Sequence, residues 1–500
     1  MAYTDALQSL KALLATIRDL KAANDVLSWD QQTYMPAGGI NTRAEQMATV
    51  SRLIHERATS AELGALLDRL DGQLDSETDD GALVRIARRD FEHDTKLSAD
   101  LVERLSRATA LADAVWVQAR LTSDWSLFAP HLRTIVELQR EMAEQYGYTT
   151  HPFDALINVD EPGTTKAQIE QMYRELKVGT LPLMKAIRQQ QDDDRTRPLH
   201  GQFDEARQEQ FGMEVIKRFG FDWNRGRQDR AVHPFCTNFS MNDVRLTTRF
   251  DPTWLAPAMF GTMHEAGHGM YEQGVAQRFT RSPLAAGCSM GIHESQSRLW
   301  ENLVGRSRPF WEFFYAPLQN LFPEQLQSVD LDTFYRAINS VQPSLIRVEA
   351  DELTYNLHTL LRFEVELGLL EGTLKVEEVP ALWNAKVAEY LGITPPNDTL
   401  GALQDVHWSA GLFAYFPTYT VGNVLAVQFF DAAVAASPAI PDEMRQGEFG
   451  TLHGWLNENI YQHGRKYDPN DLVQRATGRP MDTAPYISYL KTKYGALYKL

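Results

Sequence analysis

Apolar residues recur every three or four positions along most of the chain, which is the period of an amphipathic α-helix. The N-terminal stretch shows this first, with Leu7, Leu10 and Leu14 on one side of the expected helix. Residues 101–121 and 345–370 repeat the pattern. The sequence therefore predicts an all-α protein.

Only residues 243–250, DVRLTTRF, combine alternation with β-branched side chains strongly enough to predict a strand. Breaks in the helical pattern are short and rich in Pro, Gly or charged residues, at 35–39, 159–165, 189–198 and 393–398. None of them is a long low-complexity linker, and the sequence has no internal repeat. We therefore expect one large, predominantly helical domain over residues 1–500, with a small accessory β-sheet.

Composition narrows the class of protein. A net charge of −17 disfavours binding to nucleic acid or to an anionic membrane surface. The two cysteines, Cys236 and Cys288, and the lack of a secretory leader pattern predict a reduced, cytoplasmic protein. Residues 408–430 carry no charge, but Pro417 and Gly422 interrupt them, so we expect a buried core segment rather than a membrane span.

The segment HEAGH, residues 264–268, places two histidines four positions apart. Side chains at that spacing on a helix differ by about 40° around the axis, so His264 and His268 can share one metal ion. Glu265 projects about 100° away from His264, which leaves it free to hold a water molecule rather than the metal. The alternative is an ordinary helix with two core histidines, because the motif also occurs without a metal.

The bounds of this helix are also predicted. Asp251 is a suitable N-cap, Pro252 a suitable first residue and Gly274 a suitable end. Three glycines inside the helix weaken it relative to alanine, which indicates that substrate or another helix approaches its backbone closely. These glycines are Gly261, Gly267 and Gly269.

A catalytic zinc site has three protein ligands and one open position. Glu272 lies on the same helix but is rotated by about 80° from His264. His293 and Glu294 begin another amphipathic segment, and neighbouring residues point about 100° apart, so only one of the two should reach the ion. We predict Glu294. Glu301 shares its face about 10 Å further along, either as support for a ligand or as a solvated ion-pair partner.

Six short motifs occur in order along the chain, and together they are more specific than HEAGH alone. They resemble the signatures of the carboxypeptidase Taq metallopeptidases, and the similarity extends to LSWDQQTYMP near the start and to YFPTYTVGN at 415–423. Two small departures are Cys236 directly after HPF and the missing tyrosine before EPG in NVDEPG. The six motifs are HPF (233–235), DVRLT (243–247), HEAGH (264–268), HESQ (293–296), IRVEAD (346–351) and GALQDVHW (401–408).

The resemblance implies that His264, His268 and Glu294 bind Zn²⁺ and that Glu265 is the catalytic carboxylate. It also implies a homodimer and a helical fold with a deep central groove, similar to neurolysin and angiotensin-converting enzyme. The implied reaction is release of single C-terminal residues from peptides with broad side-chain tolerance. Co²⁺ suits the same ligands, so the sequence does not decide between the two metals.

Zinc lowers the pKa of a bound water towards 7, and Glu265 would take its proton and pass it to the departing amine. The oxyanion of the intermediate needs a further donor. His407 and Tyr419 are the candidates, and Tyr415 is a weaker alternative. The competing interpretation is structural, because a tyrosine in an aromatic run is usually a core residue whose hydroxyl finds a partner.

An exopeptidase must also bind the terminal carboxylate of its substrate, and the planar fork of arginine fits that group. Arg347 in IRVEAD resembles the motif of the family and is assigned this role, with Arg245 in DVRLT as the other candidate cation. Each could instead form a structural ion pair: Arg347 with Glu349 or Asp351, and Arg245 with Asp243 or Asp405.

Two other functions compete with a zinc carboxypeptidase. One is a zinc oligopeptidase or dipeptidyl carboxypeptidase of the same helical fold. The other is a catalytically silent helical protein that binds metal or peptide, which would need neither Glu265 nor an oxyanion donor.

Overall fold

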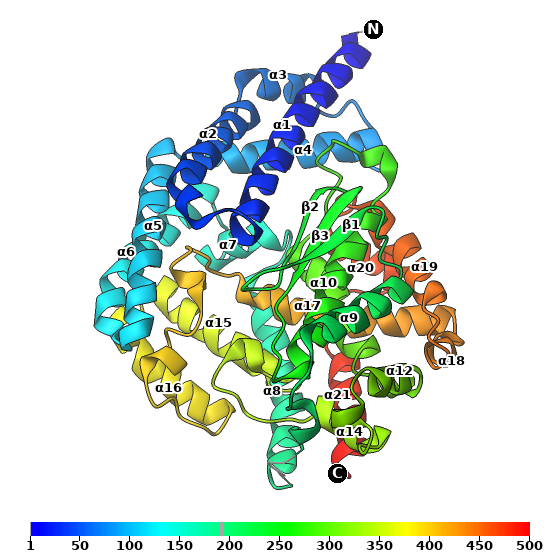
Figure 1. Ribbon diagram of the computed structural model, residues 1–500. Coiled ribbons are helices and arrows are strands. Elements are labelled where there is room, and N and C mark those ends of the chain that lie inside the picture. The colour runs from blue at the N-terminus through cyan, green and yellow to red at the C-terminus, as the bar shows by residue number, and fades with distance from the viewer. Residues whose placement is uncertain (1, 191–194) are drawn as a thin grey trace. The chain divides into compact units, whose positions relative to one another are not determined.

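The computed structural model describes residues 2–190 and 195–500, which form helices along most of their length and one three-stranded sheet (Figure 1). The predicted helical fold with a small sheet is confirmed. The chain divides into two compact units, each described here by itself. The first comprises Met1–Thr95, Asp194–Ile338 and Leu425–Met481, and the second Lys96–Asp193, Asn339–Val424 and Asp482–Leu500. The single domain remains a prediction.

The first unit contains the N-terminal helices, the sheet and the helices that follow it. Its helices, apart from the last residue of α4, are α1 (Ala2–Thr33), α2 (Ile40–Ala58), α3 (Ala61–Leu70), α4 (Asp79–Lys96), α9 (Glu205–Phe219), α10 (Leu255–Gly274), α11 (Met290–Arg298), α12 (Arg308–Leu321), α13 (Pro323–Leu326), α14 (Leu331–Ile338), α18 (Ile440–Met444), α19 (Gly450–Asn459) and α20 (Pro469–Thr477). A π-helix, η4 (Leu299–Val304), continues α11, and short 3₁₀ turns are η1 (Ala37–Gly39), η2 (Arg197–Leu199), η3 (Gln277–Phe279) and η9 (Tyr461–His463).

The N-terminal helix is confirmed and extends over Ala2–Thr33. Its predicted apolar side, which includes Leu10, is buried in a hydrophobic core shared with α3, α4 and the segment from Val275 to Ala285. This packing fixes α1 against the chain that connects α10 to α11.

The sheet has the order β1-β3-β2, with β1 (Gly226–Arg230) parallel and β2 (Cys236–Ser240) antiparallel to the central β3 (Asp243–Thr248). The predicted strand at 243–250 is β3, two residues shorter at its end. The register pairs Cys236 with Leu246 and Asn238 with Val244, and it shifts at an irregularity between Asn238 and Ser240. Helix α10 packs against β2 and β3 (Figure 1).

The predicted start of α10 at Asp251 and Pro252 is wrong, because the helix begins at Leu255. The carboxylate of Asp251 accepts hydrogen bonds from the backbone N–H and the hydroxyl of Thr253 and so stabilises a turn instead. Trp254 forms an isolated antiparallel bridge with His200, which holds this stretch extended. The predicted end at Gly274 is confirmed.

The second unit is helical over its described residues. Its helices are α5 (Ala99–Thr122), α6 (Trp125–Tyr146), α7 (Pro152–Asp160), α8 (Lys166–Arg188), α15 (Tyr355–Glu371), α16 (Val379–Tyr390) and α21 (Ala484–Tyr498), and its 3₁₀ turns are η5 (Arg347–Glu349), η6 (Val376–Glu378), η7 (Asp398–Leu400) and η8 (Val406–Trp408). The predicted break at 189–198 follows the end of α8, and residues 191–194 of it lie outside the described residues.

One further helix, α17 (Phe416–Ala436), begins in the second unit and ends in the first. It is the one helix of the described chain long and apolar enough to cross a membrane, with a mean hydropathy of 1.2. However, 61% of its most apolar window is buried inside the protein. This burial favours the predicted core segment.

Candidate active site

Three potential metal ligands converge between α10 and α11 in the first unit. The Nε2 atoms of His264 and His268 lie 3.7 and 3.5 Å from the same oxygen, Oε2 of Glu294. One ligand atom from each residue lies within 4.8 Å of the other two. Two imidazole nitrogens and one carboxylate oxygen in this arrangement are a donor set that suits a divalent ion of the zinc type.

The opposite nitrogen of each imidazole has a partner, which tests whether the Nε2 atoms can act as ligands. A histidine that binds metal through Nε2 carries its proton on Nδ1, and that N–H needs an acceptor. Nδ1 of His264 lies 3.0 Å from Oε2 of Glu301, and Nδ1 of His268 lies 2.6 Å from Nδ1 of His293. Burial lowers the pKa of His268 to about 3, so this imidazole is neutral. The residues present therefore fit a metal ion.

Glu294 is held in place by side chains of its own helix. Its Oε1 accepts a 2.6 Å hydrogen bond from Nε of Arg298, and its Oε2 accepts one of 3.1 Å from the hydroxyl of Ser297. Burial alone would raise the pKa of Glu294, but Arg298, His264 and His268 outweigh it and hold the pKa well below its usual value. The side chain is therefore ionised and has a fixed orientation, as a metal ligand requires.

A π-helical turn, η4 (Leu299–Val304), carries the carboxylate that contacts His264. Glu301 also accepts hydrogen bonds from Arg298 at 3.2 Å and from Arg306 at 3.3 Å. Burial opposes ionisation, but Arg298, His264 and Arg306 lower the pKa of Glu301 to about 2. Of the two roles considered for Glu301, contact with a ligand agrees with its position, because the residue is buried rather than solvated.

Glu265 is buried beside the group, with only 7% of its surface exposed. Burial raises its pKa to about 7, where His264 opposes the shift and the nearby carboxylates of Glu294 and Glu301 add to it. A carboxylate with a pKa near neutrality can both accept and donate a proton at pH 7.

The two residues that competed with Glu294 for the third ligand position contact each other. Nε2 of His293 lies 2.8 Å from Oε1 of Glu272, while Nδ1 of His293 faces His268. Sequence reasoning did not assign them this role. The available signal was that Glu272 lies one turn after His268 on α10 and that His293 directly precedes Glu294 on α11.

Glycine allows α10 and α11 to approach. A methyl group on Gly267 would lie 2.5 Å from the carbonyl oxygen of Gln296 and 2.6 Å from Cα of Ser297. The sequence left open whether substrate or another helix approaches these glycines. At Gly267 it is another helix, α11. Gly269 is also crowded, with two hydrophobic side chains at 2.9 Å, whereas the nearest atom to such a methyl on Gly261 is 4.0 Å away.

A second cluster of candidate residues surrounds Arg347 in the second unit. The guanidinium of Arg347 donates to both oxygens of Asp405, at 3.0 and 2.9 Å, and to the hydroxyl of Tyr355 at 2.8 Å. Its ion-pair partner is thus Asp405 rather than Glu349 or Asp351. Sequence reasoning considered Asp405 only as a partner for Arg245, and it overlooked Tyr355.

His407 and Tyr419 meet in the same cluster, with Nε2 of His407 3.3 Å from the Tyr419 hydroxyl. Burial lowers the pKa of His407 to about 3, with Arg347 adding to the shift and Asp405 opposing it. The imidazole is therefore neutral. The ring of Tyr415 lies 5.4 Å from that of Tyr419 and 6.0 Å from that of His407, so all three candidate oxyanion donors are neighbours.

Arg245 lies on β3 in the first unit and pairs with Asp243 through two hydrogen bonds of 2.9 and 3.0 Å. Its guanidinium also stacks on Trp29, 4.2 Å from the ring centre, and on Phe239 at 4.6 Å. These contacts agree with the structural role considered for Arg245.

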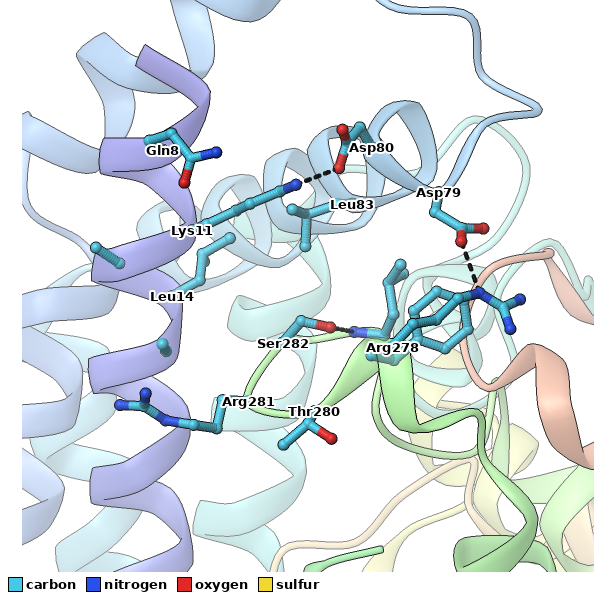
Figure 2. A pocket seen from close by; sticks show the side chains of 14 residues that line it. Gln8, Lys11, Leu14, Asp79, Asp80, Leu83, Arg278, Thr280, Arg281 and Ser282 are labelled. Atoms are coloured by element: carbon cyan, nitrogen blue, oxygen red, sulfur yellow. Dashed lines mark hydrogen bonds and ion pairs between the residues drawn. The ribbon is translucent and has the colours of Figure 1, made fainter. Parts of the chain in front are cut away.

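Figure 2 shows a different cavity of the first unit, between α1, α4 and the chain around Arg278. Its lining includes none of the candidate site residues. Charged side chains in it pair with each other, Lys11 with Asp80 and Arg278 with Asp79.

Comparisons with known proteins agree on one family. A family model described as carboxypeptidase Taq (M32) metallopeptidase matches residues 9–494. The chain is 37% identical to carboxypeptidase 1 of Bacillus subtilis over 98% of both chains, and 38% identical to thermostable carboxypeptidase 1 of Thermus thermophilus over 96% of both. The crystal structure of an M32 carboxypeptidase from Deinococcus radiodurans superposes with a TM-score of 0.97 at 42% identity, covering 99% of this chain and 100% of that one.

Proposed function

The chain belongs to the carboxypeptidase Taq (M32) family of metallopeptidases, and from this premise we propose that it releases single C-terminal residues from peptides with broad side-chain tolerance. One Zn²⁺ is held by His264, His268 and Glu294. The observation that supports this proposal most is the approach of both Nε2 atoms to one oxygen of Glu294.

Glu265 performs the proton transfers. A divalent ion at this site supplies a Lewis acid that polarises the scissile carbonyl and makes water nucleophilic at neutral pH. Glu265 accepts the proton of the attacking water and delivers it to the nitrogen of the leaving amino acid as the C–N bond breaks. The pKa of about 7 suits both transfers, because neither form of the carboxyl is strongly favoured.

Arg347 binds the terminal carboxylate of the substrate. A guanidinium carries five N–H groups, and the contacts to Asp405 and Tyr355 use three of them, so the fork has capacity for a carboxylate. Asp405 fixes the plane of the fork. Arg245 is the second candidate for this role, although its Nε and Nη2 groups already donate hydrogen bonds to Asp243.

His407 and Tyr419 stabilise the oxyanion. If the neutral imidazole of His407 donates its Nε2 proton to the Tyr419 oxygen, this contact fixes the orientation of the Tyr419 hydroxyl. One such donor is worth about 10²–10³-fold in kcat. Tyr415 is the alternative donor, because its ring adjoins both residues.

The alternative activity is that of a zinc oligopeptidase or a dipeptidyl carboxypeptidase. A peptide and its C-terminally amidated twin separate the activities. We expect mass-spectrometric ladders that lose one residue at a time from the free peptide, and little cleavage of the amide. Equal cleavage of both, or release of dipeptides, would contradict single-residue release.

Metal analysis of the purified protein tests the metal. We expect one zinc per chain, and activity that returns when the apoprotein is reloaded with Zn²⁺ or Co²⁺. A protein that is fully active without a bound divalent ion would rule out the proposal.

The assembly and location of the protein are proposed on the family resemblance and on composition. We propose a cytoplasmic homodimer, and Cys236 and Cys288 form no disulfide with each other, which suits a reducing compartment. Sedimentation equilibrium of the purified protein measures the oligomeric state directly.

A further inference from the structure

We propose that a relay of hydrogen bonds from the N-terminal helix sets the metal affinity of His268. The relay joins α1, β2, α10 and α11 of the first unit, and its members are Arg18, Asn238, Glu272 and His293. The inference rests on the proposed function, because it assigns these four residues a role towards one proposed metal ligand.

The contacts are continuous. Nη2 of Arg18 lies 3.3 Å from Oδ1 of Asn238, and the amide nitrogen of Asn238 donates to Oε2 of Glu272. The other oxygen of Glu272 lies 2.8 Å from Nε2 of His293, and Nδ1 of His293 lies 2.6 Å from Nδ1 of His268. Glu272 is buried, at 7% exposure. A partially buried cation on α1 is thus connected to a ligand on α10 through three side chains.

Only one order of donors and acceptors satisfies both ends of this relay. His268 must keep Nε2 bare to bind a metal, so its proton lies on Nδ1 and is donated to Nδ1 of His293. His293 then carries its own proton on Nε2 and donates it to Glu272. At the other end, Arg18 can only donate, so Asn238 turns its oxygen to Arg18 and its NH₂ to Glu272.

The carboxylate of Glu272 therefore receives hydrogen bonds from both sides. Through His293 it fixes the tautomer and the ring orientation of His268. Hydrogen-bond partners of metal-binding histidines fix the orientation of the ring in this way. These residues are positioning residues, because none of them supplies an atom to the group of three ligands.

An exchange of two side chains tests the order of the relay. In Glu272→Gln, the new amide accepts a hydrogen bond from His293 only when its oxygen faces His293. Its NH₂ then faces the NH₂ of Asn238, so two donors oppose each other. If Asn238 flips to compensate, its NH₂ faces Arg18 instead. Asn238→Asp has the opposite fault, because two carboxylates face each other. In the double variant Glu272→Gln/Asn238→Asp, every donor again meets an acceptor.

Zinc affinity is measured on each apoprotein by competition with a chromophoric chelator, and the visible spectrum of bound Co²⁺ reports the ligand geometry. We expect each single variant to bind Zn²⁺ about 10- to 100-fold more weakly, the range found for partners of metal ligands. We expect the double variant to return to within about threefold of the wild type, since the two changes couple through one contact.

The matched control is Asn242→Asp, on the turn that follows β2. Asn242 exchanges two hydrogen bonds of 3.1 Å with Gln277 and is exposed, so the same chemical change there should leave zinc affinity unaltered. Circular dichroism confirms folding of each variant, and recovery in the double variant excludes general damage by the single ones.

The results separate two failures. A folded wild-type apoprotein that binds no Zn²⁺ would overturn the proposed function and the relay with it. A wild type that binds Zn²⁺, with both single variants within about threefold of it, would overturn the relay alone. A double variant as weak as Glu272→Gln would also overturn the relay, because matched hydrogen bonds would then have no effect.

Discussion

At the scale of single residues, Glu265 carries the proposed proton transfer. Glu265→Gln preserves size and hydrogen bonding but removes the proton acceptor. We expect kcat to fall by about 10²–10⁴-fold, the usual contribution of general acid–base catalysis, while metal content stays unchanged. Peptide turnover and metal analysis of the same preparation test this, and unchanged kcat in a metal-loaded variant would remove Glu265 from the mechanism.

Asp405 makes a pH-dependent contribution to stability. Burial opposes its ionisation, but Arg347 and, more weakly, His407 and Arg362 lower its pKa from 3.8 to about 2. A lowered folded-state pKa stabilises the protein above pH 3.8, and this contribution disappears as the pH falls towards 2. The shift corresponds to roughly 2 kcal/mol.

Asp405→Asn tests this contribution. We expect the free energy of unfolding in urea to differ most between wild type and variant at pH 7. The difference should shrink between pH 4 and pH 2 as the wild-type carboxylate takes up its proton. A difference that stays constant over this range would contradict the lowered pKa of Asp405 in the folded protein.

At the scale of elements, the contact between α10 and α11 depends on one missing side chain. Gly267→Ala would place a methyl group 2.5 Å from the backbone of α11. We expect a loss of about 1–3 kcal/mol in stability, as for other overpacked sites, together with weaker zinc binding because the proposed ligands come from both helices.

Gly261→Ala is the control on the same helix, because the nearest atom there is 4.0 Å away. Alanine favours helix over glycine by about 0.8–1.0 kcal/mol, so this variant should be as stable as the wild type or more stable. Chemical unfolding compares the two variants, and equal losses in both would contradict the close contact at Gly267.

The helices at the site were largely predictable, and their irregularities were not. The spacing of His264 and His268 predicted that both side chains share one face of a helix. The sequence left a choice between the neighbours His293 and Glu294 as the third ligand, and only the packing of α10 on α11 resolves it. In one regular helix, Glu301 would lie about 10 Å from Glu294 along the helix axis. The π-helical turn changes the rotation per residue, and Glu301 contacts His264 instead.

Strand β1 and one ion pair escaped prediction for different physical reasons. The segment GRQDR of β1 is too polar to read as a strand, and it is held by backbone pairing with β3. The pairing of Arg347 with Asp405 joins residues far apart in sequence, so a search for partners within one helix turn missed it.

At the scale of the whole molecule, a bound ion should contribute to folding stability. An ion that binds only the folded state adds about 4 kcal/mol when its free concentration is 1,000-fold above its Kd. We expect a strong chelator to lower the Tm of the wild type and added Zn²⁺ to restore it. His268→Ala, which lacks one proposed ligand, should show a smaller response to the chelator. An unchanged wild-type Tm after complete metal removal would contradict this linkage.

The class of the molecule was predictable from the sequence, whereas the sequence does not mark the two compact units. Helical periodicity and the buried side of α1 followed from the apolar pattern. The two compact units did not, because each consists of three separate stretches of chain and no linker composition marks their boundaries.

The position of Asn238 within β2 has a consequence for how the gene tolerates insertions and deletions. Successive side chains of a strand point to opposite faces, so a slip of one residue exchanges the two faces. Loss of a single codon within β2 would bring Phe239 or Thr237 to the place where Asn238 meets Glu272. A change in a strand that contributes no proposed ligand would then weaken metal binding, and natural length variation should avoid this stretch.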